Sequence, residues 1–356
     1  MSLPSFLALP VLANRSSIFN SDGMKVFIKL CLLFSIPFFL LGVAYVWFDP
    51  FKVIYHYDNY YVPGDGGSVN RNFVSTMNYL NKKDTYHYDS FIFGNSRSLF
   101  YRIEDWKKHL APESSCYHFS ESSGSINGLY YKLKLIDERG GSINNALLVV
   151  DHGLLRRMEQ DGVAYIMPPA LTGNRNWLRF HGEHFMQWLN PRFLVSWAEF
   201  QATGKYKSYM TDFVVKGVNY KYYDPVTNEE PRGYQDSLLK AGTYYTKGVI
   251  NGFKGKQTPS TSRKMIDKEE KLEKLMEMRK IFDKHHTNYK FIISPLYDQV
   301  KVNPEDYQTL CDIFGKEHIY DYSGVNAWTS DYHNYYEWSH YLPSIAAEVM
   351  DDAYSH

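Results

Sequence analysis

The chain has 356 residues, of which 44% are hydrophobic and 22% are charged, so it is long and apolar enough to form a packed core. Lysine plus arginine balances aspartate plus glutamate at 39 each. A nucleic-acid-binding domain usually carries a basic excess, so this class of partner is excluded.

Near the N-terminus, residues 30–48 (LCLLFSIPFFLLGVAYVWF) contain no charged side chain. As a helix these 19 residues would span about 28 Å, close to the ~30 Å hydrocarbon core of a bilayer. Lys25 and Lys29 precede the segment and Asp49 follows it. The positive-inside rule therefore predicts a cytoplasmic tail (1–29), a transmembrane anchor in the lipid bilayer (30–48) and an extracytoplasmic remainder.

Two other interpretations of this segment remain open. It could be a buried core helix, or a cleaved signal peptide with a weak small-residue site at residues 42–44. The bulky residues that follow, Tyr45 to Phe48, favour retention of the anchor. A single anchor and few cysteines suit a bacterial envelope protein facing the periplasm.

Beyond a membrane-proximal segment (49–84), the chain alternates short apolar runs with helical patterns. This alternation is typical of βαβ units and a parallel sheet, so we expect one α/β domain over residues 85–354. Helices are expected at 262–284 and 342–354, and a large insertion or cap at 157–260. The five predicted strands are residues 88–93, 116–119, 146–150, 290–293 and 318–322.

The first of these strands runs into Gly94-Asn95-Ser96, and residues 100–110 (FYRIEDWKKHL) are predicted to form a helix. At such a turn the hydroxyl of Ser96 would be exposed, and backbone N–H groups at a helix N-terminus would favour developing negative charge. Alternatively, the Ser and Asn simply cap an ordinary helix.

A second motif near the C-terminus is Glu337-Trp338-Ser339-His340. Serine needs a base to become a nucleophile, histidine is the usual base, and a carboxylate three residues earlier could orient its imidazole. A structural histidine is the alternative. In a sheet of order 2-1-3-4-5, Ser96 after the first strand and His340 after the last would both face the carboxyl edge.

The layout resembles the SGNH (GDSL-like) hydrolase superfamily. Gly94-Asn95-Ser96 is similar to its Gly-Asp-Ser block, and Glu337 to His340 is similar to its Asp-x-x-His block with glutamate for aspartate. The resemblance implies a three-layer, flavodoxin-like α/β fold with a five-stranded parallel sheet of order 2-1-3-4-5. It also implies that the N–H groups of Ser96 and Gly124 form the oxyanion hole.

The family's Gly-x-Asn-Asp block has no match, because Asp151-His152-Gly153 occupies its place. His152 is therefore a candidate for the missing oxyanion donor, and Asp331 is a rival to Glu337 as the orienting acid. Losing one oxyanion donor costs roughly 10²–10³ in turnover.

These observations predict a serine esterase or O-acyltransferase acting on acyl esters of a cell-envelope glycan, with Ser96, His340 and Glu337 as catalytic residues. With the anchor, the chain resembles membrane-bound members that work beside a membrane-bound O-acyltransferase, which is a further expected partner. The alternative is a non-catalytic glycan-binding or scaffold protein. Three cysteines and the absence of Cys/His ligand spacing suggest no metal, and no cofactor is expected.

Overall fold

The computed structural model of the protein describes residues 21–58, 60, 70–210, 224–230 and 232–355. The chain divides into two compact units, Met1–Phe48 and Asp49–His356. Most of the predicted cytoplasmic tail, residues 1–20, lies outside the described residues, as do residues 211–223 of the predicted insertion.

The first unit is a single helix, α1 (Ser21–Phe48), which begins nine residues before the predicted segment of 30–48. Its residues 22–48 include an 18-residue window with a mean hydropathy of 2.4, none of which is buried. Helix α1 is thus long and apolar enough for a membrane span or a signal sequence. The alternative of a buried core helix is wrong, since a core helix would bury this apolar surface.

The second unit is built on a five-stranded parallel sheet of order β2-β1-β3-β5-β7. Counting only these strands, the order is the predicted 2-1-3-4-5. Each predicted strand is present within two residues of its expected ends, because each short apolar run is bounded by turn residues or polar side chains. The strands are β1 (Ser90–Gly94), β2 (Cys116–Ser120), β3 (Asn145–Val150), β5 (Asn288–Ile293) and β7 (Ile319–Asp321).

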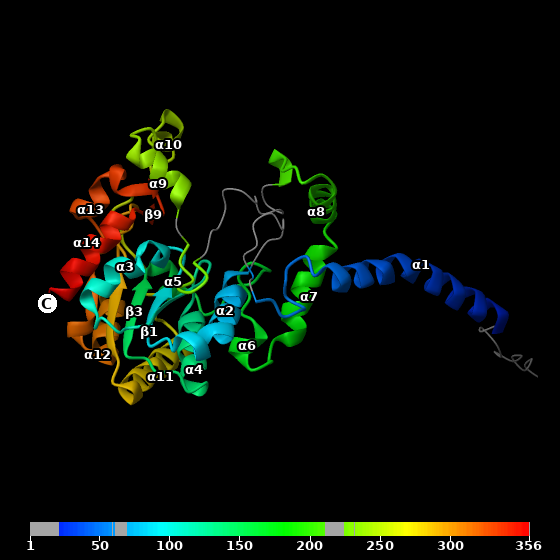
Figure 1. Cartoon of the computed structure of the whole chain (residues 1–356), viewed down its shortest axis with the longest axis horizontal. Helices are drawn as coiled ribbons and strands as arrows, with labels where there is room; N and C mark the ends of the chain where they lie inside the picture. Colours follow the sequence, from blue (N-terminus) through cyan, green and yellow to red (C-terminus); the bar gives the residue numbers. More distant parts are fainter. Residues whose placement is uncertain (1–20, 59, 61–69, 211–223, 231, 356) are drawn as a thin grey trace, which may run out of the picture. The chain divides into compact units, whose positions relative to one another are not determined.

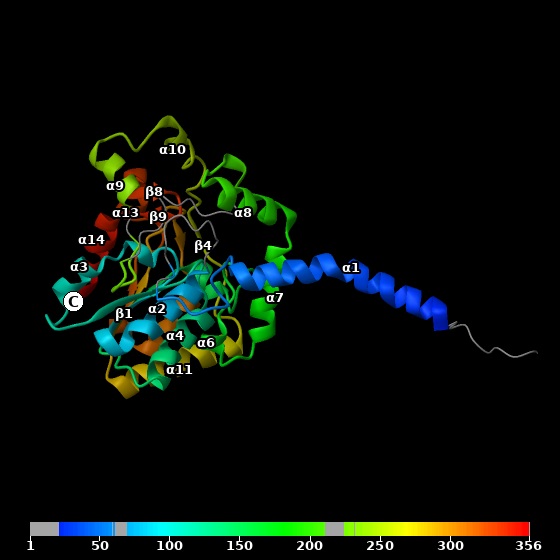
Figure 2. The same ribbon diagram turned by 45° about the vertical axis from the view of Figure 1, so that its right-hand side comes forward.

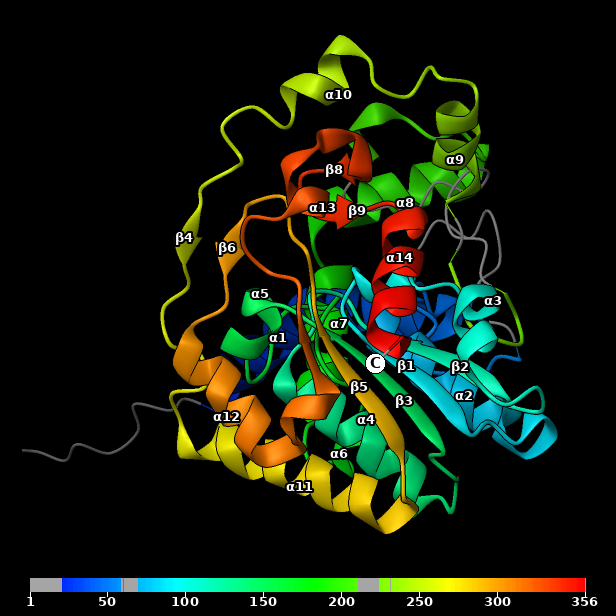
Figure 3. The same cartoon turned by 90° about the vertical axis from the view of Figure 1, so that its left-hand side faces the viewer.

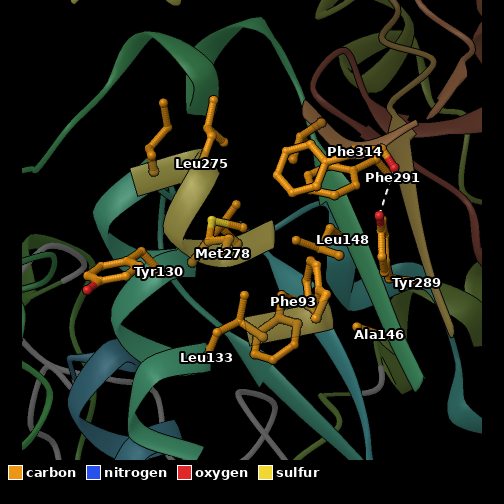
Figure 4. Packing of buried hydrophobic residues seen from close by; sticks show 14 of the residues in the cluster. Phe93, Tyr130, Leu133, Ala146, Leu148, Leu275, Met278, Tyr289, Phe291 and Phe314 are labelled. Atoms are coloured by element: carbon orange, nitrogen blue, oxygen red, sulfur yellow. Dashed lines mark hydrogen bonds between the residues drawn. The ribbon is translucent and has the colours of Figure 1, made fainter. Parts of the chain in front are cut away.

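Both faces of the sheet are buried, which explains why its strands are nearly continuous apolar runs. Phe93, Leu148 and Phe291 point toward α2 (Arg71–Tyr86), α4 (Ile126–Glu138), α11 (Glu269–His285) and α12 (Pro304–Phe314) (Figure 4). On the other face, Ile92 and Val149 contact α3 (Ile103–Trp106) and α14 (Pro343–Tyr354). Figure 1 shows these three layers, and Figure 3 shows α14 lying across its face of the sheet.

Two predicted helices differ from the structure. The helix expected at 262–284 begins only at Glu269, because the Asp306 carboxylate accepts hydrogen bonds from the backbone N–H groups of Met265 and Ile266 and holds that segment extended. The helix expected at 100–110 is broken into the 3₁₀ helix η1 (Ser98–Phe100), α3 and the 3₁₀ helix η2 (Lys107–His109). Helix α2, in the segment expected to be membrane-proximal, was not predicted.

The long connection from β3 to β5 contains several helices, of which α9 and α10 lie close to the β8–β9 hairpin (Figure 2). Besides α11, the described part of the connection comprises α5 (His152–Arg156), α6 (Pro169–Thr172), α7 (Trp177–Trp188), α8 (Pro191–Thr203), η3 (Ser208–Met210), α9 (Gly233–Lys240), α10 (Lys247–Asn251) and β4 (Ser260–Thr261). The remaining elements are β6 (Val300–Lys301), which pairs with β4, η4 (Lys316–His318), α13 (Ala327–Ser330), η5 (Tyr332–Asn334), β8 (Tyr335–Glu337) and β9 (His340–Tyr341).

Candidate active site

Ser96 lies in the tight turn that follows β1. The turn needs glycine at position 94, where φ is +154° and a Cβ would lie 2.6 Å from the backbone oxygen of Val149. Asn95 is fully buried, and its side-chain oxygen accepts a hydrogen bond from the N–H of Arg97 at 2.9 Å. Ser98 closes the turn by donating its hydroxyl to the Asn95 backbone oxygen at 2.8 Å. Ser96 itself is half-buried, so its hydroxyl is held at an accessible position.

Glu337 and His340 lie on a short antiparallel hairpin formed by β8 and β9. The turn of the hairpin brings the two side chains together, and Nδ1 of His340 is hydrogen-bonded to Oε1 of Glu337. Ser339 donates its backbone N–H and its hydroxyl to the same carboxylate, each at 2.9 Å. The carboxylate is therefore fixed by its own hairpin.

The imidazole of His340 connects this hairpin to the turn after β1. Its Nε2 is 2.8 Å from Oγ of Ser96. Since a carboxylate can only accept, Nδ1 of His340 carries the proton toward Glu337 and a neutral ring presents an acceptor at Nε2 to the Ser96 hydroxyl. The structure thus joins Ser96, His340 and Glu337 in one hydrogen-bonded chain, which is the arrangement needed to move a proton away from Ser96.

The ionisation of the two titratable groups suits such a transfer. Burial opposes ionisation of Glu337, but the hydrogen bond and charge of His340, together with Ser339, outweigh it and lower the pKa of Glu337 to about 2. Burial also lowers the pKa of His340, and the positive charges of Arg232 and Arg97 add to this effect, while Glu337 opposes it. At neutral pH Glu337 is thus a carboxylate and His340 a neutral base.

The buried carboxylate of Asp151, directly after β3, contacts both the turn that holds Ser96 and the start of α5. Asp151 accepts hydrogen bonds from the N–H groups of Gly153 and Leu154, capping α5, and from the Asn95 amide. Its other interaction is an ion pair with Arg97 at 2.8 Å. Burial opposes ionisation of Asp151, but Arg97 and the Asn95 amide lower its pKa overall.

Arg97 also donates from Nε to the backbone oxygen of Ser339 at 3.1 Å. It therefore links the turn after β1, the end of β3 and the hairpin that carries His340. Neither Arg97 nor a role for Asp151 was predicted from the sequence. The only signals were an arginine directly after Ser96 and an aspartate at the carboxyl end of a buried strand.

The expected oxyanion donors are only partly in position. Gly124 lies against the turn that holds Ser96, since a Cβ there would be 2.7 Å from Cβ of Asn95, and its φ of +63° favours glycine. However, its N–H donates to the backbone oxygen of Ser122 at 2.8 Å. Within the part of the chain that the structure describes, the N–H of Ser96 has no acceptor.

Two further residues named from the sequence, the oxyanion candidate His152 and the rival acid Asp331, are hydrogen-bonded to other side chains. Nε2 of His152 is 3.0 Å from the carboxylate of Asp298. Asp331 caps η5 and is bonded to Nδ1 of His333 at 2.8 Å. The carboxylate that contacts His340 is therefore that of Glu337 and not that of Asp331.

Helix α3 has only four residues and starts at Ile103, well beyond Ser96. The expected helix N-terminus at Ser96 is thus replaced by a single 3₁₀ turn, because Arg102 takes an extended conformation and interrupts the helix. A helix dipole therefore contributes little at Ser96, since its effect is confined to the terminal turn of a longer helix.

No three His, Cys, Asp or Glu side chains among the described residues cluster so that they could ligate a metal ion. Comparison of the chain with protein-family models, with curated proteins and with solved structures finds no match.

Proposed function

We propose that this protein is a serine-dependent acyl-ester enzyme, an esterase or an O-acyltransferase of the SGNH-like type. The observation that carries the proposal is the hydrogen-bonded chain Ser96–His340–Glu337, with 2.8 Å between Oγ of Ser96 and Nε2 of His340. A serine hydroxyl is a weak nucleophile unless a neighbouring base accepts its proton, and this chain supplies the base and the group that orients it.

The proposed reaction has two stages. Oγ of Ser96 attacks the ester carbonyl while Nε2 of His340 takes its proton, and the leaving alcohol departs with that proton from His340. Water (esterase) or a sugar hydroxyl (transferase) then attacks the acyl-enzyme, giving its proton to His340, and Ser96 is released with its proton restored. The N–H of Ser96 is free to hold the oxyanion, and that of Gly124 joins it if the turn at Ser122 opens.

The proposed substrate is an acyl ester of a cell-envelope glycan, reached from the outer face of the cytoplasmic membrane. Helix α1 supports this location by its length and apolar composition, and Lys25 and Lys29 near its N-terminal end favour a cytoplasmic N-terminus. A membrane-bound O-acyltransferase that supplies the acyl group is the partner proposed for the transferase version.

A serine-directed fluorophosphonate probe tests this proposal on the full chain in a neutral detergent. We expect covalent labelling of the wild type that is lost in Ser96→Ala and in His340→Ala. Ser330→Ala is the matched control, because Ser330 is exposed, its hydroxyl donates to the Asn326 backbone oxygen, and it belongs neither to the motifs of Ser96 and His340 nor to their hydrogen bonds. An unlabelled wild type would sink the enzymatic proposal.

A second candidate function is glycan binding without turnover. It is favoured by one observation, the hydrogen bond from the Gly124 N–H to Ser122, which withdraws an expected oxyanion donor. Under this alternative the wild type binds glycan without reacting with the probe.

A further inference from the structure

A half-buried arginine lies beside the Ser96–His340 pair, on a platform of two aromatic rings. Cζ of Arg232 is 4.9 Å from the centre of the Phe100 ring and 5.2 Å from that of Tyr336. The Phe100 ring also contacts the imidazole of His340, edge to face, with 5.5 Å between centroids. The Phe100 ring therefore contacts both His340, the proposed base, and the guanidinium of Arg232, which is always charged.

The platform orients Arg232 without using its hydrogen-bond donors. A guanidinium over ring faces keeps its five N–H groups available in its own plane. Among the described residues none of these donors has an acceptor, whereas Arg97 is paired with Asp151 and Arg102 with Asp236. Such an unpaired fork matches the geometry of a carboxylate or a phosphate.

Two carboxylates near this platform have other partners, and one of them, Asp236, pairs with Arg102 and accepts a hydrogen bond from the Tyr336 hydroxyl. Glu337 accepts from His340 and Ser339 and makes no ion pair with Arg232. A second cation flanks the same hairpin, because the ammonium of Lys256 lies over the ring of Trp338 at 4.9 Å. Within the described part of the chain, neither Arg232 nor Lys256 has an ion-pair partner.

The charge of Arg232 reaches the reacting groups. The pKa of His340 is lowered first by burial and then by Arg232 and Arg97, against the opposing effect of Glu337. Because the Phe100 ring contacts both Arg232 and His340, a ligand anion on Arg232 would lie close to the ester carbonyl that we propose Ser96 attacks.

We propose that Arg232 forms an anion subsite of the Ser96–His340 centre and binds a carboxylate or phosphate group carried by the ester substrate. The inference rests on the proposed function, since it names the substrate class of the same site. Its physical basis is a bidentate, charge-assisted contact from a guanidinium that the Phe100 and Tyr336 rings hold in place.

The test measures hydrolysis of three acetylated sugars by the full chain in neutral detergent: a neutral methyl glucoside, a methyl glucuronide and a glucose 6-phosphate. We expect kcat/KM to be about tenfold higher for at least one anionic ester than for the neutral one. Arg232→Gln should remove this preference, and Arg232→Lys should keep part of it. The glucuronide and phosphate arms identify which anion is preferred.

Lys240→Gln is the matched control, because it removes one positive charge from the exposed end of α9, the helix that follows Arg232. It should retain the anionic preference. Equal loss in both variants, or a wild type without any preference, overturns the subsite.

The same sugars without the acetyl group separate this inference from the proposed function. Calorimetric titration should show tighter binding of the anionic sugar to the wild type than to Arg232→Gln. If turnover and fluorophosphonate labelling both fail while this difference persists, the subsite stands and the enzyme proposal falls. If labelling succeeds and neither assay distinguishes anions, only the subsite is wrong.

Discussion

At the scale of single residues, Glu337 shows how a longer carboxylate can orient a histidine. The hairpin places Glu337 and His340 on facing strands, and Ser339 adds two hydrogen bonds that fix the carboxylate. The extra methylene of glutamate relative to aspartate is absorbed by this local geometry. The pairing belongs to the hairpin alone, so it does not depend on the distant strands.

Replacing Glu337 by Gln should slow fluorophosphonate labelling of Ser96 by at least about 100-fold, because an amide cannot stabilise the imidazolium that forms and can select the wrong tautomer. Second-order labelling rates measure the effect. Asp331→Asn serves as control and should label at the wild-type rate, since Asp331 is bonded to His333. Similar slowing in both variants would contradict the assignment of Glu337.

The pH dependence of labelling should reveal the base. The reactive form needs neutral His340, so the rate falls as pH drops through the pKa of His340, which burial places below its ordinary value of 6.5. Glu337, with a pKa of about 2, stays ionised throughout this range. The charges that face His340 are Glu337, Arg97 and Arg232.

Removing a facing positive charge makes protonation of His340 easier. Arg232→Gln should therefore shift the acidic limb of the labelling profile to higher pH, and Lys240→Gln should leave it in place. A limb that does not move in Arg232→Gln would show that the Arg232 charge is screened from the base.

The two short motifs could be found from the sequence. Gly94-Asn95-Ser96 directly follows an apolar strand, and Glu337 precedes His340 by three residues, a spacing that suits an orienting carboxylate. The role of Arg97 could not be found in this way, since its partners Asp151 and Ser339 are brought to it only by the fold. The state of the Gly124 N–H was likewise hidden, because a turn between Ser122 and Gly124 depends on local backbone angles.

At the scale of elements, the edge strand β2 is covered by an irregular segment. The N–H of His118 on β2 donates to Thr227, and the Asn228 amide donates to the His118 backbone oxygen, each at 2.8 Å. An exposed strand edge would otherwise be open to pairing with another chain. The side chain of His118 turns inward and its Nε2 is bonded to the backbone oxygen of Ser98 at 2.8 Å.

His118 should make the fold sensitive to acid. Burial lowers its pKa from 6.5 to about 4, so between these values the unfolded chain binds a proton that the folded chain does not. Stability is therefore complete above about pH 6.5 and is lost as pH falls toward 4. We expect His118 to account for about 1.5–2 kcal/mol of the loss in unfolding free energy between pH 6.5 and 5.

Urea unfolding at the two pH values checks this expectation. His118→Gln keeps a donor for Ser98 and should show a smaller loss between them than the wild type. His56→Gln, at an exposed histidine, is the control and should behave as the wild type. His184, whose pKa burial also lowers to about 4, supplies a residual loss in every variant.

The helices were harder to predict than the strands. Residues 262–268 have a helical pattern, but the buried Asp306 carboxylate captures their backbone N–H groups. Residues 100–110 have a similar pattern, but Arg102 is extended and the Glu229 carboxylate accepts a hydrogen bond from the N–H of Ile103. In both cases a contact from outside the segment overrides local propensity.

At the scale of the whole molecule, the sheet order was predictable because five apolar runs alternate with helical patterns. Helix α2 was not, since its mostly polar sequence gives a weak apolar signal. The long connection between β3 and β5 could be recognised by its length, but the positions of most helices within it could not be predicted from the sequence.

If α1 is a retained anchor, the full chain should sediment with membranes and stay there at alkaline pH. Intact mass spectrometry of the extracted protein should then include residues 30–48. A mature N-terminus after residue 44 would instead identify α1 as a signal sequence. A soluble version should begin no later than Asp49, whose carboxylate binds the N–H groups of Val53, Ile54 and Tyr55.

The separation of Ser96 and His340 by 244 positions has a consequence for biogenesis. During synthesis Ser96 emerges early, while His340 and the Ser339 oxygen that receives Arg97 follow more than 200 residues later. A chain that stops before residue 340 would consequently hold Ser96 without the imidazole that contacts its hydroxyl. Under the proposed function, the reactivity of Ser96 would therefore arise only once the hairpin that carries His340 has been synthesised and has folded onto the turn after β1.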